Sequence, residues 1–387
     1  MARHLLVTND YLPKTGGIQV YLHELWRRLE TGRASVLTAS SHPQAALFDA
    51  RTEVVVERVK APTLILPLPR TLAAIEAAIE RHQPDLVLLD PAWPLGVLGP
   101  RLSRPYGVVL HGAEVAIPGR LPLVASTLRY VLRHASVAVC AGSYPEAEAR
   151  RNAAEWMPPV IQIPPGVDTQ RFVPLAPERR AAIRESLGLS PDALLVSSYS
   201  RLVPRKGMDT LIRASALLVP RFPQLQVAIG GAGRDRERLE RMAQKLRAPV
   251  VFLGRVDDEY LSPWLGASDL MVMACRNRWA GLEQEGFGIV FLEAAASGVA
   301  QVAGRSGGSH EPVRDGVTGF VVDRPRSEDA LASAMTRLLE DAALRESFAR
   351  HARALVEEQY DWRVLARRLS EGLAPFDHAT VAPEGAV

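Results

Sequence analysis

Apolar residues follow two alternating patterns along almost the whole chain. Short runs rich in β-branched residues predict strands, and longer segments whose apolar positions recur every three or four residues predict amphipathic helices. The predicted strands cover residues 5–8, 36–39, 54–59, 86–90, 108–111, 137–141 and 160–163, and then 194–199, 226–230, 250–253, 270–274, 300–303 and 320–322. The predicted helices cover residues 18–29, 70–82, 177–187, 208–221, 234–246, 289–297, 328–339, 343–358 and 362–373.

Regular alternation of strands and helices is typical of parallel sheets joined by crossover helices. The two series of strands therefore predict an α/β protein with two doubly wound, Rossmann-like domains. We expect the first domain at residues 1–168, a linker rich in proline and turn formers at 169–192, and the second domain at 193–358. A C-terminal helix at 359–376 is expected to pack back on the first domain, and residues 377–387 to form a mobile tail.

Composition excludes several classes of protein. Of the 387 residues, 47% are hydrophobic and 23% charged, which is ordinary for a soluble globular protein. The net charge of +3 gives no reason to expect a nucleic-acid partner. Cys140 and Cys275 each lie in an apolar run, so a disulfide framework is excluded and a reducing compartment is expected. Without a signal peptide or a run of about 20 apolar residues, the sequence predicts a cytoplasmic protein that at most touches a membrane.

Charge is uneven in one stretch of the first domain. Between residues 91 and 145 the only acid is Glu114, whereas the basic residues of this stretch include Arg101, Arg104, Arg120, Arg129 and Arg133. Residues 121–134 within it predict an apolar helix with basic edges. Two interpretations stay open: a core helix, or a surface that contacts anionic lipid at the inner face of the cell membrane.

Two carboxylates bracket an apolar run in the second domain, where Glu285 and Glu293 enclose Gly-Phe-Gly-Ile-Val-Phe-Leu. Buried carboxylates are costly unless they are paired, and an ionised carboxylate accepts hydrogen bonds from hydroxyl groups. The pair therefore indicates a helix start that faces a ligand rich in hydroxyls. The alternative is that Glu285 lies in a solvated loop and Glu293 on an exposed helix face.

Cations and glycines occupy other strand-to-helix loops. Arg201 and Lys206 follow the first strand of the second domain, and their chemistry suits a diphosphate, because arginine forks onto phosphate oxygens and lysine supplies a mobile charge. Arg205, between them, is expected to be a spare, solvated cation. Gly16-Gly17 precedes the first helix, where backbone amides favour an anion, although a tight turn is the alternative.

Further strand ends complete the outline of a nucleotide-sugar site. Residues 230–233 (Gly-Gly-Ala-Gly) and 304–311 (Gly-Arg-Ser-Gly-Gly-Ser-His-Glu) allow the backbone to approach a ligand closely. His111 ends a strand of the first domain, where it is either structural or beside the reacting group, and Asp10 could orient a substrate hydroxyl. Residues 257–259 (Asp-Asp-Glu) predict an acidic helix N-terminus rather than a metal site, so no metal is expected.

These motifs, in this order, resemble the retaining, GT-B-type glycosyltransferases of family four over nearly the whole chain. The resemblance is carried by Gly16-Gly17, His111-Gly112, residues 165–172 (Pro-Gly-Val-Asp-Thr-Gln-Arg-Phe), residues 200–207 (Ser-Arg-Leu-Val-Pro-Arg-Lys-Gly), the Glu285 and Glu293 pair, and residues 304–311. More narrowly, residues 8–19, 200–207 and 285–293 look like the actinobacterial phosphatidylinositol monomannoside mannosyltransferases. Those enzymes transfer mannose from GDP-mannose to a lipid-linked inositol mannoside.

The resemblance implies a GT-B fold, in which an acceptor domain and a nucleotide-sugar domain face a central cleft. It also implies a role for each matching residue: the cations with the Gly-Gly amides hold the diphosphate, Glu293 binds the ribose, and Glu285 binds the sugar. The expected catalytic residues are His111, Arg201, Lys206 and Glu285. The expected donor-binding residues are Gly16, Gly17, Arg201, Lys206, Gly231, Val256, Glu285, Phe287, Gly288 and Glu293.

The chain departs from the family pattern at two places. Residues 110–114 are Leu-His-Gly-Ala-Glu where the mannosyltransferases usually carry Thr-His-Gly-His-Glu, and residues 307–311 are Gly-Gly-Ser-His-Glu where Gly-Gly-Ala-Pro-Glu is usual. The expected function is retaining transfer of mannose from GDP-mannose to a phosphatidylinositol mannoside-type lipid, without a metal or other cofactor. The alternatives are transfer from a UDP-sugar to a polysaccharide or small molecule, a phosphorylase on the same fold, and a non-catalytic sugar-nucleotide binding protein.

Overall fold

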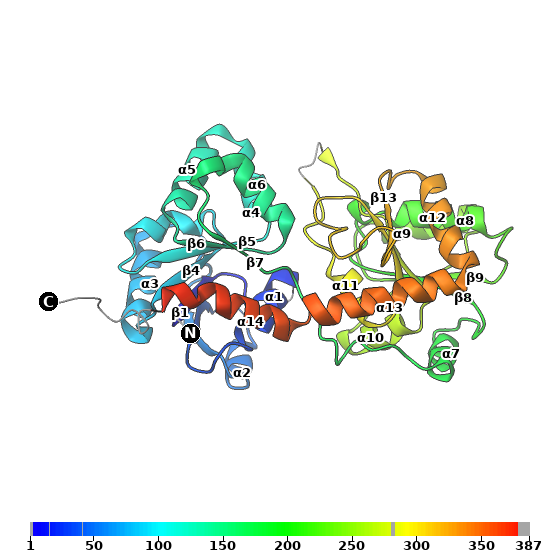
Figure 1. Ribbon diagram of the computed structural model, residues 1–387, viewed down its shortest axis with the longest axis horizontal. Helices are drawn as coiled ribbons and strands as arrows, with labels where there is room; N and C mark the ends of the chain where they lie inside the picture. The colour runs from blue at the N-terminus through cyan, green and yellow to red at the C-terminus, as the bar shows by residue number, and fades with distance from the viewer. Residues whose placement is uncertain (1–2, 15, 41, 280–282, 378–387) are drawn as a thin grey trace. The chain divides into compact units, whose positions relative to one another are not determined.

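The computed structural model describes residues 3–14, 16–40, 42–279 and 283–377. The chain divides into two compact units (Figure 1), of which the first combines Met1–Pro165 with Trp362–Val387 and the second is Gly166–Asp361. Nearly all of the predicted mobile tail at 377–387 lies outside the described residues.

The first unit is built on a parallel sheet with the strand order β3-β2-β1-β4-β5-β6-β7. Its strands are β1 (His4–Thr8), β2 (Ala34–Ala39), β3 (Val55–Val59), β4 (Leu86–Asp90), β5 (Tyr106–Leu110), β6 (Val137–Cys140) and β7 (Val160–Gln162). Its helices are α1 (Gly17–Trp26), α2 (Ala45–Asp49), α3 (Pro69–His82), α4 (Ala113–Ala116), α5 (Pro122–His134), α6 (Ser143–Ala153) and α14 (Trp362–Leu373), with 3₁₀ turns η1 (Leu95–Arg101), η2 (Pro118–Arg120), η3 (Ala154–Trp156) and η6 (Ala374–Phe376).

Apolar side chains fill both faces of this sheet, because neighbouring residues of a strand point to opposite sides. On one face Leu5 and Val7 pack in a core with residues of α3 and α5. On the other face Leu6 packs with α1 and α14, whose Trp362 joins the same core. The last helix of the chain therefore belongs to the first unit and lies beside α1 (Figure 1).

The second unit repeats this architecture with the strand order β10-β9-β8-β11-β12-β13. Its strands are β8 (Leu194–Tyr199), β9 (Leu225–Gly230), β10 (Val250–Gly254), β11 (Leu270–Met273), β12 (Ala300–Gly304) and β13 (Gly319–Val322). Its helices are α7 (Pro177–Ser186), α8 (Met208–Leu218), α9 (Arg236–Leu246), α10 (Asp258–Gly266), α11 (Ile289–Ala296), α12 (Glu328–Glu340) and α13 (Ala342–Gln359), with the 3₁₀ turn η4 (Pro204–Lys206). The prediction of two parallel-sheet α/β domains is confirmed.

The segment at 169–192, predicted as a linker, is part of the second unit. Its helix α7 carries the buried Arg184, whose guanidinium donates to the carbonyl oxygens of Ala193 and Ala267 at 2.8 and 2.9 Å. The same side chain pairs with Asp269 at 2.9 Å. A buried cation with this many acceptors holds the segment against the sheet.

Among the described residues no helix has the length and hydrophobicity that crossing a membrane requires.

Candidate functional site

Cations gather where β8 ends in the second unit. Arg201 is exposed, and its guanidinium has no hydrogen-bond or ion-pair partner among the described residues. Lys206, at the end of η4, is only 8% exposed. The carboxyl ends of parallel strands are where α/β proteins bind ligands. This loop therefore presents the exposed Arg201 and the buried Lys206 at the expected edge of the sheet.

Lys206 and Arg205 both contact Glu285. The Lys206 Nζ lies 2.8 Å and the Arg205 Nε 3.3 Å from the same carboxylate oxygen. Burial alone would raise the pKa of Glu285, but Lys206 and Arg205 outweigh it and hold that pKa below its ordinary value. The expectation that Arg205 is a spare, solvated cation is wrong, because its side chain is largely buried against Glu285.

Two glycines allow the loops to meet. Gly207 has a φ of 72°, and a Cβ there would lie 2.0 Å from the Ala274 carbonyl oxygen. Gly231, a predicted donor-binding residue, has a φ of 137°, and its Cβ would lie 1.8 Å from the Ser200 carbonyl oxygen. A side chain at either position would push apart the segments that carry the cations.

Arg276 supports the cationic loop from behind, and the sequence analysis did not single it out. Its backbone N–H donates to the Arg205 carbonyl at 2.9 Å. Its buried guanidinium donates to the Asp209 carboxylate at 2.9 Å and to the Thr210 hydroxyl at 3.2 Å, both in the first turn of α8. In the sequence, an arginine after an apolar strand looks like an ordinary surface residue. Only the burial of Arg276 and its contacts with α8 show that it supports the loop.

Glu285 leads into a turn that starts α11. Gly288 precedes the helix with a φ of 82°, and Phe287 is buried in the apolar core, so Phe287 can offer a ligand only its backbone. The first amides of a helix have no partner within the helix and favour an anion or an oxygen acceptor. Glu285 therefore precedes the N-terminus of α11 by only a few residues.

Glu293 lies in α11, one turn beyond its first residue, and is partly buried. Its carboxylate has no hydrogen-bond or ion-pair partner in the part of the chain that the structure describes. Burial raises its pKa to about 7, and the more distant Arg171 guanidinium lowers it only in part. A carboxylate held without a partner in a partly buried place is suited to accept hydrogen bonds from a ligand.

The loop at 304–311 packs directly on the turn that follows Glu285. A Cβ on Gly307 would lie 2.4 Å from the Glu285 carbonyl oxygen, and one on Gly308 would lie 2.2 Å from the Gly286 carbonyl oxygen. Ser306 donates its hydroxyl to the Asn277 amide oxygen at 2.8 Å. These glycines are therefore needed for packing against the site.

The segment after β10 was expected to contribute Val256. This residue is partly buried and packs against the apolar core that also contains Phe287. The acidic residues that follow begin α10, and Asp258 pairs with Arg171 at 2.8 Å. Within the described residues no cluster of three or more histidine, cysteine or acidic side chains is arranged to hold a metal ion.

A second group of polar residues lies at the carboxyl end of the sheet in the first unit. His111 follows β5, and its Nε2 lies 2.8 Å from the Asp90 carboxylate, which ends β4. The Thr8 hydroxyl donates to the other Asp90 oxygen at 2.5 Å. Burial alone would lower the pKa of His111, but Asp90 outweighs it and raises that pKa. The sequence analysis named His111 and missed Asp90.

Gly16 and Gly17 lie at the start of α1, where both are exposed and Gly16 occupies the N-cap position. Nearby, the Gln19 amide donates to the Asp10 carboxylate at 2.9 Å. Both glycines therefore stay at an accessible helix N-terminus in the first unit, as a phosphate-binding role would require.

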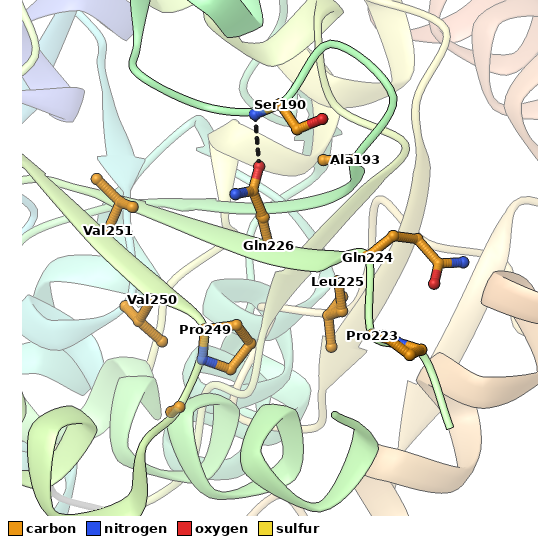
Figure 2. Close-up of a pocket in the computed structure, with 10 residues that line it drawn as sticks. Ser190, Ala193, Pro223, Gln224, Leu225, Gln226, Pro249, Val250 and Val251 are labelled. Atoms are coloured by element: carbon orange, nitrogen blue, oxygen red, sulfur yellow. Dashed lines mark hydrogen bonds between the residues drawn. The ribbon is translucent and has the colours of Figure 1, made fainter. Parts of the chain in front are cut away.

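The second unit also has a pocket at the opposite end of its sheet. Figure 2 shows this pocket of about 510 Å³, in which the Gln226 amide oxygen accepts from the Ser190 backbone N–H at 2.9 Å. Ala193, Gln224 and Pro249 line it, and each comes just before a strand begins. The pocket therefore lies at the amino ends of β8, β9 and β10, whereas Arg201, Lys206 and Glu285 lie beyond carboxyl ends.

Two family models match the chain. The model described as "Glycosyltransferase Family 4" matches residues 15–171, and the model described as "Glycosyl transferases group 1" matches residues 179–355. The second match contains all the cations and glutamates of the candidate site, and the first contains His111 and the Gly-Gly turn.

The chain is also similar to curated proteins over nearly its full length. It is 39% identical to the "GDP-mannose-dependent alpha-(1-6)-phosphatidylinositol monomannoside mannosyltransferase" of Mycolicibacterium smegmatis, across 96% of this chain and 98% of the relative. It is 37% identical to the protein of the same name from Mycobacterium tuberculosis, across 98% of this chain and 100% of the relative.

Solved structures share the fold. Anabaena Alr3699/HepE in complex with UDP matches with a TM-score of 0.80 at 23% identity, across 96% of this chain and 100% of that one. Sucrose-phosphate synthase from Thermosynechococcus elongatus matches with a TM-score of 0.77 at 22% identity, across 96% of this chain and 98% of that one. Both likenesses bear on architecture, and they agree with two Rossmann-like domains of the GT-B type.

Proposed function

The chain belongs to the group 1 and family 4 glycosyltransferases, and on this premise we propose that it transfers mannose from GDP-mannose to a phosphatidylinositol mannoside-type lipid. The observation that carries the proposal is the arrangement of free and paired charges beside β8 and α11. Among the described residues Arg201 and Glu293 have no side-chain partner, whereas Lys206, Arg205 and Glu285 form one largely buried group. The names of the mycobacterial relatives supply the donor and the acceptor.

In this proposal the second unit binds GDP-mannose. Arg201 forks onto diphosphate oxygens, and Lys206 adds a donor, because an ammonium group has three hydrogens and can contact Glu285 and a phosphate together. Glu293 accepts from the ribose hydroxyls. Glu285 and the amides near Phe287 and Gly288 bind the mannose. Because the two cations neutralise the diphosphate, no metal ion is required.

The proposed reaction proceeds with retention at the anomeric carbon. The bond from that carbon to the β-phosphate oxygen breaks as the acceptor oxygen bonds to the same face of the sugar. The acceptor proton passes to the departing phosphate oxygen. Negative charge grows on the β-phosphate, and fixed donors such as Arg201 and Lys206 stabilise it by about 3 kcal/mol each, the usual worth of one such donor. His111 is proposed to contact the sugar or the acceptor polyol.

The test is incubation of the protein with GDP-mannose and phosphatidylinositol monomannoside, with the glycolipid product followed by mass spectrometry. We expect a product that is heavier by one hexose and whose new linkage is α. UDP-glucose and ADP-glucose serve as matched donors, and a larger thermal shift and faster transfer with a UDP-sugar would overturn the choice of GDP-mannose. Tight binding of GDP without product from any acceptor would instead favour the sugar-nucleotide binding protein.

The lipid acceptor raises the question of membrane contact. One side of α5 is core, with Leu128 and Val131 fully buried, which agrees with the first of the two interpretations of this helix. The opposite side leaves Leu123 87% exposed, and Arg129 and Arg133 of the same helix are exposed as well. We therefore propose that α5 and the turn before it contact the anionic inner face of a membrane peripherally, through apolar insertion and charge attraction.

Co-sedimentation with vesicles of phosphatidylcholine and 30% phosphatidylglycerol tests this contact. The double variant Arg129→Glu/Arg133→Glu should lose most of the binding at low salt. The matched control Arg241→Glu/Lys245→Glu changes the net charge equally on the exposed side of α9 and should bind as the wild type does. Equal binding by both double variants, or no binding by the wild type, would contradict the proposed surface.

A further inference from the structure

Asp90 is a buried carboxylate whose two oxygens are both occupied. It ends β4 and is 1% exposed. One oxygen lies 2.8 Å from Nε2 of His111, and the other accepts the Thr8 hydroxyl at 2.5 Å. A carboxylate this deep needs hydrogen-bond partners that compensate for lost hydration. Thr8 and His111 provide that compensation, from the ends of β1 and β5.

The charged groups that act on His111 come from three elements, and each is an acid. Asp90 comes from β4, Asp10 from the loop after β1, and Glu114 from α4, where it also accepts the backbone N–H of His111. On another side the Tyr21 ring of α1 lies edge-on, with 5.5 Å between the ring centroids. Burial lowers the pKa of His111, but these acids, Asp90 above all, reverse the effect and raise it.

The hydrogen bond to Asp90 leaves His111 one ring nitrogen for a ligand. Because the Asp90 carboxylate accepts, Nε2 must carry a proton. In a neutral ring Nδ1 would then be an acceptor, and in the charged ring it is a donor. Nδ1 has no partner among the described residues. The charge state that Asp90 stabilises therefore decides which hydrogen bond His111 can make.

We propose that Asp90, with Thr8, is a positioning residue that holds His111 protonated on both ring nitrogens, so that Nδ1–H donates to a hydroxyl oxygen of the sugar or polyol that reacts. The inference rests on the proposed function and deepens it. A neutral polyol suits this place better than a phosphate does, since Asp10, Asp90 and Glu114 together outnumber the one cationic ring.

The first test is the titration of His111 itself, which needs no substrate. The imidazole signals of the protein, labelled at its 9 histidines, are followed by NMR against pH, and His111 is assigned with the variant His111→Gln. We expect the His111 pKa above 6.5 in the wild type. In Asp90→Asn, which keeps the shape and removes the charge, the pKa should fall by about one unit or more.

Asp85→Asn is the matched control. Asp85 is also a buried aspartate, but it precedes β4 at the opposite end, where it accepts the backbone N–H of Arg3 at 2.8 Å. The variant Asp85→Asn should leave the pKa of His111 unchanged. An unchanged His111 pKa in Asp90→Asn, or an equal shift in Asp85→Asn, would overturn the inference.

If Asp90→Asn does not fold, Thr8→Val takes its place. This variant should raise the His111 pKa, because the Asp90 carboxylate loses a competing hydrogen-bond donor. A fall in the His111 pKa, or no change, would overturn the inference.

The second test is the pH dependence of mannose transfer. With a protonated His111 as the active form, kcat/KM should decline as pH rises through the His111 pKa, and in Asp90→Asn this decline should move to lower pH by the shift that NMR measures. A profile that does not move while the pKa does would overturn the hydroxyl contact. Absence of transfer in the wild type would refute the proposed function and leave the titration as the separate measure of the Asp90 pair.

Discussion

The polar groups at the carboxyl ends of the two sheets are organised differently. Among the described residues of the second unit, the site has a largely buried group, Lys206 with Arg205 and Glu285. Two further side chains there, Arg201 and Glu293, have no partner among those residues. In the first unit, His111 lies among the acids Asp10, Asp90 and Glu114. The second unit therefore has cations that can bind an anionic ligand. In the first unit the acids instead determine the protonation state of the His111 ring.

This difference indicates which chemistry each unit can recognise. A diphosphate needs permanent cations, and the second unit provides them on a loop whose backbone is held by close packing at Gly207 and Gly231. Neutral hydroxyls need donors and acceptors in fixed positions and no permanent cations. The Thr8, Asp90 and His111 chain meets that requirement.

Removing the buried cation should have the largest effect. In Lys206→Met the departing phosphate loses a fixed donor, so kcat should fall about 100- to 1,000-fold. Steady-state transfer with GDP-mannose measures this, and calorimetry with GDP measures the accompanying loss of affinity. The control Arg213→Met removes a half-exposed cation of α8 that is 3.7 Å from Glu328 and should stay within about twofold of wild type, as expected for a surface pair. Equal loss in both variants would contradict a specific role for Lys206.

Removing the Glu293 carboxylate should reduce the affinity for the nucleotide, with a smaller effect than the loss of Lys206. In Glu293→Gln at pH 8 the affinity for GDP should fall about 10-fold or more, as for the loss of hydrogen bonds to a charged group. Because the pKa of Glu293 is about 7, the wild-type affinity should increase from pH 6 to pH 8 as the carboxylate ionises. Calorimetry across this range should show that Glu293→Gln lacks the increase. A pH-independent wild-type affinity would count against the ribose contact.

Glu293→Gln should also stabilise the protein in the absence of ligand. The folded-state pKa of Glu293, about 7, lies above its ordinary value of 4.5, so the folded state binds more protons between these values. The free energy of unfolding therefore decreases as pH rises through this window, and the loss is complete above it. At pH 8 Glu293→Gln should raise Tm by about 2 °C or more, whereas at pH 4.5 the difference should vanish. A lower Tm at pH 8 would mean that Glu293 has a stabilising partner.

Weakening the support behind the cationic loop should have the smallest effect. Arg276→Lys keeps the charge but cannot hold Asp209 and Thr210 together, so kcat/KM should fall about 2- to 10-fold. Because Arg276 acts through the position of Lys206 and Arg201, the KM for GDP-mannose should rise more than kcat falls. A change in Tm without any change in KM would show that Arg276 serves the fold alone.

Much of the fold could be predicted because its signals are local. Each predicted strand, from 5–8 to 320–322, is present in the structure. Buried parallel strands have a clear sequence signal, because they consist of short apolar runs bounded by turn residues. The helix α14 has the predicted bounds, 362–373, from its periodic apolar positions. The helix α6 was missed, because its polar sequence has a weak apolar stripe and it packs mainly through small residues such as Ala149 and Ala153.

The candidate site could be predicted only in part. Arg201 and Glu293 were found from residue type and from their places after a strand and inside a helix start. Asp90 was missed because an aspartate between an apolar run and a proline looks like a turn residue. Its role depends on Thr8 and His111, which are distant in the sequence and adjacent only in the sheet.

The sequence by itself determined the two parallel sheets, the order of the loops at their carboxyl ends, and the kinds of side chain available there. These features follow from periodicity and residue chemistry, which act over a few neighbouring residues. Only the tertiary structure decided which charges are paired and which are free. It placed Arg205 and Lys206 on Glu285, left Arg201 and Glu293 without a partner in the part of the chain that the structure describes, and buried Asp90 beside His111. The strength of an ion pair and the pKa of a group depend on distance and burial, and both are set by how loops far apart in the chain meet.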